Sequence, residues 1–175
     1  MKYKIDFLLR AVLISVVFIV IVGIGYTNMQ YRLDYIEIIN ECFEGGYDDQ
    51  IIRDKVIIGN QEYLFYGRDD IGYGYIKLER GLNKKYKILR KDKSSQYFQI
   101  INPVIKSKMF NIIIGHNPQE GSISCELSDS FIHNNIVTGD FILIYNSDTY
   151  TTITKEEIVF KDENGINITE KVTKL

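Results

Sequence analysis

Apolar and polar positions along the chain fall into three successive patterns. Residues 11–26 form an apolar run without a charge, residues 31–44 repeat apolar side chains every three or four positions, and from Lys55 onward apolar and polar residues alternate. These patterns are typical of a membrane-crossing helix, a short amphipathic helix and a series of β-strands. We therefore predict a mainly β fold in which residues 1–27 form a cytoplasmic tip and transmembrane helix and residues 28–175 form one extracytoplasmic β-rich domain.

The apolar run is long enough to cross a bilayer only together with the residues just before it. As a helix, Ala11–Tyr26 rises about 24 Å, and adding Phe7–Leu9 brings the length to about 30 Å, the thickness of a hydrocarbon core. Basic residues are concentrated before the run, so the positive-inside rule places the N-terminus in the cytoplasm and exports the rest. These residues are Lys2, Lys4 and Arg10 before the run, against Arg32 shortly after it.

Two arrangements remain open for this segment. Gly23 and Gly25 occupy the −3 and −1 positions of a cut before Tyr26, so the chain could be a secreted protein whose signal peptide is removed. The run lacks an A-x-A site and a polar stretch before that cut, which favours an uncleaved signal anchor.

The amphipathic segment ends at the glycine pair Gly45-Gly46, which is typical of a left-handed helix cap. This helix would either continue the anchor or pack on the following sheet. Its apolar face is predicted to hold Leu33, Ile36, Ile39, Asn40 and Phe43.

The remaining chain contains short alternating runs separated by turn residues, the pattern of an antiparallel β-sandwich or curled sheet. Gly59-Asn60 forms the two-residue turn of a hairpin, and the nearly unbroken apolar run Phe110–Ile114 predicts a central strand covered on both faces. The predicted strands are Lys55–Ile58, Gln61–Tyr66, Ile71–Glu79, Lys85–Arg90, Tyr97–Ile101, Phe110–Ile114, Ser122–Leu127, Ser130–His133, Phe141–Tyr145, Thr149–Thr152, Glu157–Lys161 and Ile166–Glu170.

Three runs carry a resemblance: KVIIGNQEYLFYG, GYGYIKLERG and MFNIIIGHNPQEGSISCEL. Together with a basic N-terminus and a single apolar span, they resemble small envelope proteins of low-GC Gram-positive bacteria for which no function is assigned. The resemblance covers roughly residues 30–170. It implies the same membrane topology and transfers no catalytic residues.

Composition and charge exclude some classes of function. The chain has a net charge of −2, and residues 1–26 carry +2, so the remaining chain is acidic and gives no reason to expect a nucleic acid as partner. Cys42 and Cys125 are far apart in sequence; they form either one disulfide outside the cell or two buried free thiols.

No catalytic, metal or cofactor motif emerges from the sequence. Among Cys42, His116, Cys125 and His133 no pair has the short spacing of a structural zinc site, and a mid-strand Cys125 would be a buried, unreactive thiol. In Gly72-Tyr73-Gly74 a strand follows, whereas a phosphate loop requires a helix there; glycines beside tyrosines in a strand more often mark a bulge or a surface covered by a neighbouring aromatic ring.

Asp162, Asn164 and Gly165 resemble part of a calcium loop. The upstream Asp is absent, and Lys171 occupies the position of the essential Glu. We therefore interpret this segment as a plain β-turn.

One segment suggests a partner. Residues 77–93 carry a local charge of +6, and alternation places Lys85 and Lys87 on one face, with Tyr86 and Ile88 pointing inward. Such lysines either face an anionic lipid or cell-wall polyanion or protect a strand edge from aggregation. The candidate polyanion- or lipid-facing residues are Lys84, Lys85, Lys87, Lys91 and Lys93.

The sequence as a whole predicts a non-enzymatic single-pass envelope protein with an exported binding domain, whose partner besides the membrane is an anionic polymer, a lipid or another envelope protein. Two alternatives remain. One is an exported hydrolase whose carboxylates are dispersed in sequence and converge in the fold. The other is an accessory or immunity-type subunit acting through its membrane helix, where Ser15 and Gly23 are the polar or small residues available for helix contacts.

Overall fold

The chain forms two units in the computed structural model. Unit 1 comprises residues 1–47 and 78–89, and unit 2 comprises residues 48–77 and 90–175. Strands β3 (Gly72–Arg80) and β4 (Tyr86–Ser94) contribute residues to both units. The structure describes residues 2–43, 51–68, 72–94, 96–127, 131–147 and 151–174.

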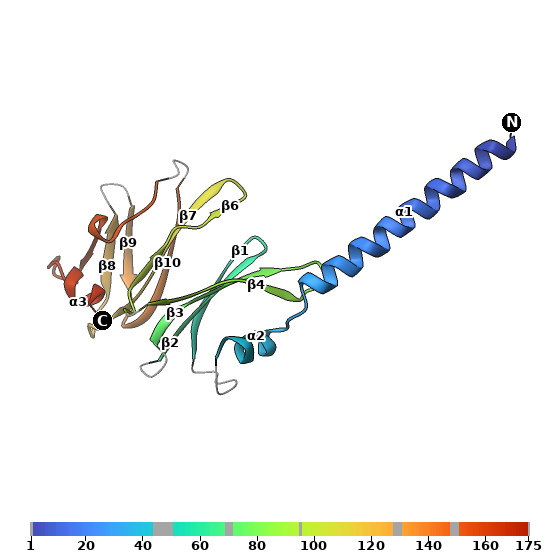
Figure 1. The fold of residues 1–175 in the computed structure, drawn as a ribbon. Helices are drawn as coiled ribbons and strands as arrows, with labels where there is room; N and C mark the ends of the chain where they lie inside the picture. Colours follow the sequence, from blue (N-terminus) through green and yellow to red (C-terminus); the bar gives the residue numbers. More distant parts are fainter. Residues whose placement is uncertain are drawn as a thin grey trace. The chain divides into compact units, whose positions relative to one another are not determined.

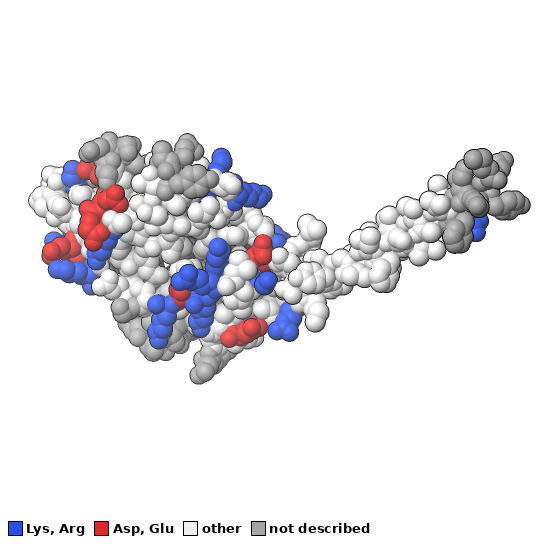
Figure 2. Space-filling model, turned by 45° about the horizontal axis from the view of Figure 1, so that its top comes forward, with Lys and Arg blue, Asp and Glu red and all other residues white. Residues whose placement is uncertain are grey.

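Unit 1 begins with a single long helix, α1 (Lys2–Gln30) (Figure 1). Its stretch Leu8–Gln30 is long and apolar enough to cross a membrane, and none of it is buried. Figure 2 shows most of α1 as a rod of uncharged side chains.

The second helix, α2 (Tyr35–Cys42), is shorter than the amphipathic helix predicted over residues 31–44. Asp34 caps it by accepting a hydrogen bond from the Glu37 N–H, while the Glu37 carboxylate accepts one from the Asp34 N–H. The helix begins there because Leu33 is extended and exchanges backbone hydrogen bonds with Tyr86 of β4.

The predicted face of α2 was partly wrong. Ile38, Ile39 and Cys42 are its buried residues, whereas Ile36 and Asn40 are exposed. Both sets recur every three or four positions, so periodicity alone does not choose between them. The helix ends at an extended Phe43, before the predicted cap at Gly45-Gly46, which lies outside the described residues.

The β structure consists of three antiparallel sheets, which make a sandwich-like arrangement (Figure 1). The first has the order β1-β2-β3-β4, the second β10-β7-β5 with β6 also paired to β7, and the third β11-β8-β9. The strands are β1 (Ile52–Ile58), β2 (Gln61–Arg68), β3 (Gly72–Arg80), β4 (Tyr86–Ser94), β5 (Gln99–Ile101), β6 (Val104–Ile105), β7 (Lys108–Asn117), β8 (Ile123–Leu127), β9 (Phe131–Ile136), β10 (Gly139–Ser147) and β11 (Ile158–Lys161).

Most predicted strands are confirmed within a few residues, and so is the hairpin at Gly59, whose φ of 65° suits a tight turn. Two predictions failed. Residues 151–152 are irregular, and the rest of the predicted strand Thr149–Thr152 lies outside the described residues. Ile166–Glu170 forms a single bridge at Asn167 and then enters helix α3 (Thr169–Thr173).

The final hairpin does not extend beyond that bridge because side-chain oxygens accept the backbone N–H groups that a longer strand pair would use. The Asp162 carboxylate accepts the N–H groups of Asn164 and Ile166, and the Thr169 hydroxyl accepts the N–H of Phe160. Ile168 and Val172, four positions apart, are then both buried on the helical turn.

Strand β7 is the centre of unit 2, as its apolar sequence predicts. It pairs with β10 on one edge and with β5 and β6 on the other. Ile112 and Ile114 pack with Val56, Tyr63 and Phe65 of the first sheet. Ile113 points the other way and packs with third-sheet residues such as Cys125, Leu127 and Phe160. The second sheet is therefore covered on both faces.

Replacing Ile113 by Ala should strongly destabilise the protein, because the side chain is fully buried and its loss leaves a cavity in the central sheet. We expect a loss of about 2–5 kcal/mol in the free energy of unfolding, measured by urea denaturation of the full chain in detergent. Val137→Ala, at a side chain that is 70% exposed, is the control and should cost less than about 0.5 kcal/mol. A loss below about 1 kcal/mol for Ile113→Ala would contradict the central position of β7.

Candidate functional site

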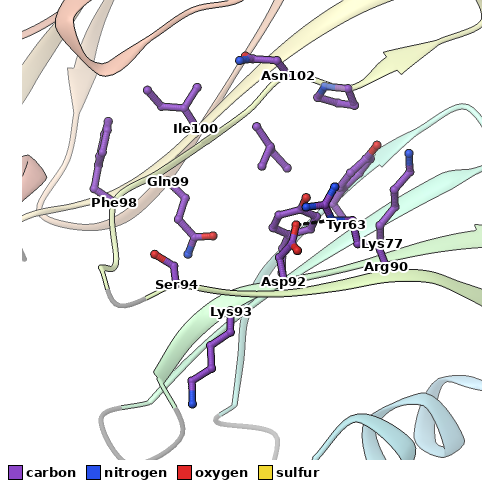
Figure 3. Close-up of a pocket in the computed structure, with 13 residues that line it drawn as sticks. Tyr63, Lys77, Arg90, Asp92, Lys93, Ser94, Phe98, Gln99, Ile100 and Asn102 are labelled. Atoms are coloured by element: carbon purple, nitrogen blue, oxygen red, sulfur yellow. Dashed lines mark ion pairs between the residues drawn. The ribbon is translucent and has the colours of Figure 1, made fainter.

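A hollow of about 700 Å³ opens in unit 2 beside the end of β4 (Figure 3). One wall comes from the first sheet, with residues of β2, β3 and β4, and the other from the segment Phe98–Pro103, which includes β5. Both β4 and β5 stand last in the order of their sheets. The hollow therefore lies between two edge strands, where backbone groups are commonly available to a partner.

An ion pair lies on the β4 wall. Alternation along the strand turns Arg90 and Asp92 to the same face, and Arg90 Nε lies 2.6 Å from Asp92 Oδ2 (Figure 3). The Tyr75 hydroxyl also donates to this carboxylate, and the pKa of Asp92 is lowered by that hydrogen bond and by Arg90. Burial, together with the hydrogen bond to Asp92, raises the pKa of Tyr75 to about 12. Asp92 is thus a fixed anion and Tyr75 a fixed neutral donor.

Aromatic rings and a second cation complete this wall. Tyr63 is buried, its ring centroid lies 6.2 Å from that of Tyr75, and its hydroxyl donates to Gln61 Oε1. Burial also raises the pKa of Tyr63. The Lys77 ammonium lies 5.6 Å from the centre of the Tyr63 ring, and within the described part of the chain it has no ion pair. Lys77 is therefore a cation held by a ring, with its charge available to an anion.

The opposite wall supplies amides. Asn102 Nδ2 donates to the Ile153 carbonyl, while Asn102 Oδ1 is buried and accepts no hydrogen bond from the described residues. Gln99 and the ring of Phe98 lie nearby on the same segment (Figure 3). Buried polar atoms are nearly always hydrogen-bonded, so Asn102 Oδ1 is an exception among the described residues.

The predicted basic residues are divided between the units. Lys84, Lys85 and Lys87 belong to unit 1, and Lys91 and Lys93 to unit 2. On β4 the odd-numbered lysines face away from Arg90 and Asp92 by alternation, and Figure 3 shows Lys93 pointing away from the hollow. Tyr86 and Ile88, predicted to point inward, are half-buried, as are Lys85 and Lys87.

The lysine face of β4 has partners of its own. Lys85 Nζ lies 3.4 Å from Asp34 Oδ2, and Lys91 Nζ lies 5.9 Å from the centre of the Tyr66 ring. Since β4 is an edge strand, these contacts favour lysines that protect the edge over a single anion-binding surface.

The remaining candidates have structural roles. Cys42 and Cys125 are buried thiols that form no disulfide with each other, and they belong to different units, so the structure has the second of the two predicted arrangements. Cys125 lies opposite His133 in the β8–β9 pairing, but burial raises the pKa of its thiol to about 12, so it is not an activated nucleophile. His116 Nδ1 lies 2.7 Å from Asp140 Oδ1.

That His116–Asp140 pair is a cross-strand contact between β7 and β10, and the Tyr97 ring packs edge-on against the histidine. No group of three His, Cys, Asp or Glu side chains within the described ranges could hold a metal ion.

A tyrosine side chain covers Gly74 of β3, which is one of the two interpretations that the sequence left open. A side chain at Gly74 would overlap the Asp92 carbonyl and the Tyr66 hydroxyl, which donates to that carbonyl at 2.6 Å. Gly74 thus lets Tyr66 cross β3 and hold the β4 backbone beside the hollow.

The Asp162 loop is the predicted turn, closed by a hydrogen bond from the Gly165 N–H to the Asp162 carbonyl.

Sequence reasoning missed the hollow itself. In the sequence, Arg90 and Asp92 count only toward the net charge of the basic segment. The alternating order Arg90-Lys91-Asp92-Lys93 could have separated two faces, one with lysines and one with an ion pair. No pattern in the sequence could have brought Phe98–Pro103 opposite to them.

Known proteins supply no further guidance on this site. No protein-family model matches the chain, and no curated protein or solved structure matches it either.

The hydrogen bond from Tyr75 should control the ionisation of Asp92. Replacing Tyr75 by Phe should raise the Asp92 pKa towards its ordinary value of 3.8, because the carboxylate loses its main stabilising contact. Carbon-13 NMR titration of the carboxyl groups in the full chain would measure this pKa, with Asp92→Asn to assign the signal. Tyr97→Phe is the control and should leave it unchanged. An Asp92 pKa that is equal in wild type and Tyr75→Phe would contradict the bond.

Proposed function

We propose that the protein is a non-enzymatic, single-pass membrane protein of the cell envelope that binds an anionic envelope polymer. Helix α1 is its anchor, with the N-terminus in the cytoplasm and unit 2 outside. The apolar stretch Leu8–Gln30 supports the anchor, and the basic residues Lys2, Lys4 and Arg10 before it support the orientation. The helix continues unbroken through Gly23 and Gly25, which favours retention over cleavage before Tyr26.

The hollow beside β4 is the observation that carries the binding function. Lys77 and Arg90 supply positive charge on one wall, and Asp92 and Gln99 supply hydrogen-bonding groups for hydroxyls. Aromatic rings and convergent polar groups in a concave site are typical of ligand binding. A polymer with alternating phosphate or carboxylate and hydroxyl groups matches this set. It also matches an anchored protein, which meets such polymers at the membrane.

Neither alternative function has comparable support. The alternative hydrolase was one with two facing carboxylates, and within the described residues lining the hollow Asp92 is the sole acid. A second hollow contains Glu126, Asp162 and Glu163. These acids are engaged: Glu126 pairs with Lys161, Glu163 accepts from Ser122, and Asp162 closes its turn.

A subunit that acts through α1 would present polar groups to a neighbouring helix. The Ser15 hydroxyl instead donates to the Ala11 carbonyl of its own helix. The open space around Gly23 and Gly25 is compatible with a close helix contact and does not by itself favour one.

Removing the Lys77 charge should weaken binding of a short glycerol phosphate oligomer to the full chain. We expect Lys77→Gln to raise the Kd about tenfold, because a charge-assisted contact is lost, and raised salt to weaken wild-type binding. Isothermal titration calorimetry in detergent would measure this. Lys108→Gln is the matched control, since Lys108 is an exposed lysine on β7 outside the hollow, and should bind like wild type. Equal affinity of Lys77→Gln and wild type would reject the hollow as the site.

The orientation can be tested with introduced cysteines. In intact cells a membrane-impermeant maleimide should label Lys108→Cys, because we place unit 2 outside. The wild-type chain should remain unlabelled, because Cys42 and Cys125 are buried. Labelling of Lys108→Cys only after lysis would overturn this topology.

A further inference from the structure

The tip of the β3–β4 hairpin is fixed to the last turns of α1 within unit 1 (Figure 1). The Asn83 amide donates to Asn28 Oδ1 at 3.0 Å and to the Tyr31 carbonyl at 2.8 Å. Its own oxygen accepts the N–H of Lys85, so one side chain holds both the turn and the helix end.

Tyr31 strengthens this attachment from the other side. Its ring lies against Gly81, where a Cβ would be only 2.6 Å from Tyr31 Cγ, and its hydroxyl donates to Glu79 Oε2 at 3.0 Å. Lys85 adds an ion pair with Asp34. The hairpin tip therefore has a fixed height along α1, at the end of the stretch Leu8–Gln30.

The side chains at this tip are those of a membrane interface. Leu82 is 98% exposed, an unfavourable position for a large apolar side chain in water. Arg80 and Lys84 flank it and are exposed, and so is Arg32 beyond the end of α1. An apolar tip flanked by cations is suited to the boundary between acyl chains and anionic headgroups.

We propose that the β3–β4 hairpin tip is a second membrane contact, in which Leu82 enters the interface of an anionic lipid surface and Arg80 and Lys84 face its headgroups. This contact rests on the proposed membrane span of α1, because the end of that span sets the height of the tip. With α1 it would fix unit 1 at two points on the bilayer, so that the helix could not rotate freely about its axis.

Tryptophan fluorescence tests this contact directly, because the chain contains no Trp. Two full-chain variants, Leu82→Trp and Ile19→Trp, are reconstituted in phosphatidylglycerol–phosphatidylcholine vesicles with or without brominated acyl chains. Ile19 lies in the middle of α1 and is 68% exposed, so the Ile19→Trp variant reports the span and the Leu82→Trp variant the hairpin. We expect bromine to reduce the emission of both by about twofold or more, and the indole of Leu82→Trp to be shielded from aqueous iodide.

The two reporters separate the possible failures. Quenching of the Ile19→Trp variant without quenching of the Leu82→Trp variant would overturn the hairpin contact and leave the anchor intact. Quenching of neither would overturn the membrane span and the contact together.

The contribution of the Lys84 charge to the membrane contact is tested by a separate comparison. Lys84→Glu in the Leu82→Trp background should reduce quenching in anionic vesicles, whereas Lys108→Glu should not. Equal quenching in both double variants would remove the headgroup contact of Lys84 from the proposal.

Discussion

The two-sided burial of β7 is the constraint on which unit 2 depends. Because successive side chains of a strand point to opposite faces, a run of isoleucines can be buried only if both faces are covered. Ile112 and Ile114 require the first sheet on one side, and Ile113 requires the third sheet on the other. The order of layers follows from this single strand. So does the position of β5, which must pair with β7 and thereby faces the end of β4.

The hollow is a consequence of where the sheets end. A sheet edge has unpaired backbone groups, and proteins usually protect it with charge or cover it. Here β4 divides its side chains: lysines occupy one face, whereas Arg90 and Asp92 lie on the other, towards the hollow. Tyr66 reaches across Gly74 to the Asp92 carbonyl and so ties the charged wall to the buried tyrosines of the core. The polar groups are therefore held in place by the fold, which under the proposed function would lower the entropic cost of binding.

In unit 1 the apolar helix α1 is connected to the polar tip of the β3–β4 hairpin. Short-range polar contacts of Asn83, Tyr31 and Lys85 join the hairpin to the end of α1 and to the residues that follow it. Such contacts are individually weak when exposed, but several between the same two elements restrict their relative motion. If α1 crosses the membrane, the same contacts decide which side chains of the hairpin meet the lipid.

The sequence by itself determined the class of the structure. The uncharged run before Tyr26 has the length of a membrane-crossing helix, the alternation after Lys55 has the period of a strand, and the short apolar block at Phe110–Ile114 fits a strand covered on both faces. Where the local sequence was compatible with two arrangements, tertiary contacts determined which one formed. The buried face of α2 turned from Ile36 to Ile38, and Ile166–Glu170 became a turn and a helix because Thr169 took the N–H of Phe160.

The candidate site is among the features that only the tertiary structure determined. Alternation along the sequence separates Arg90 and Asp92 from the lysines of the same segment, but only the pairing of β4 with β3 places Lys77 on the same wall. Phe98–Pro103 comes opposite to them because β5 pairs with β7, a contact set by burial and not by local sequence. Local patterns encode the elements, whereas a site assembled from several strands exists only after long-range packing has placed them side by side.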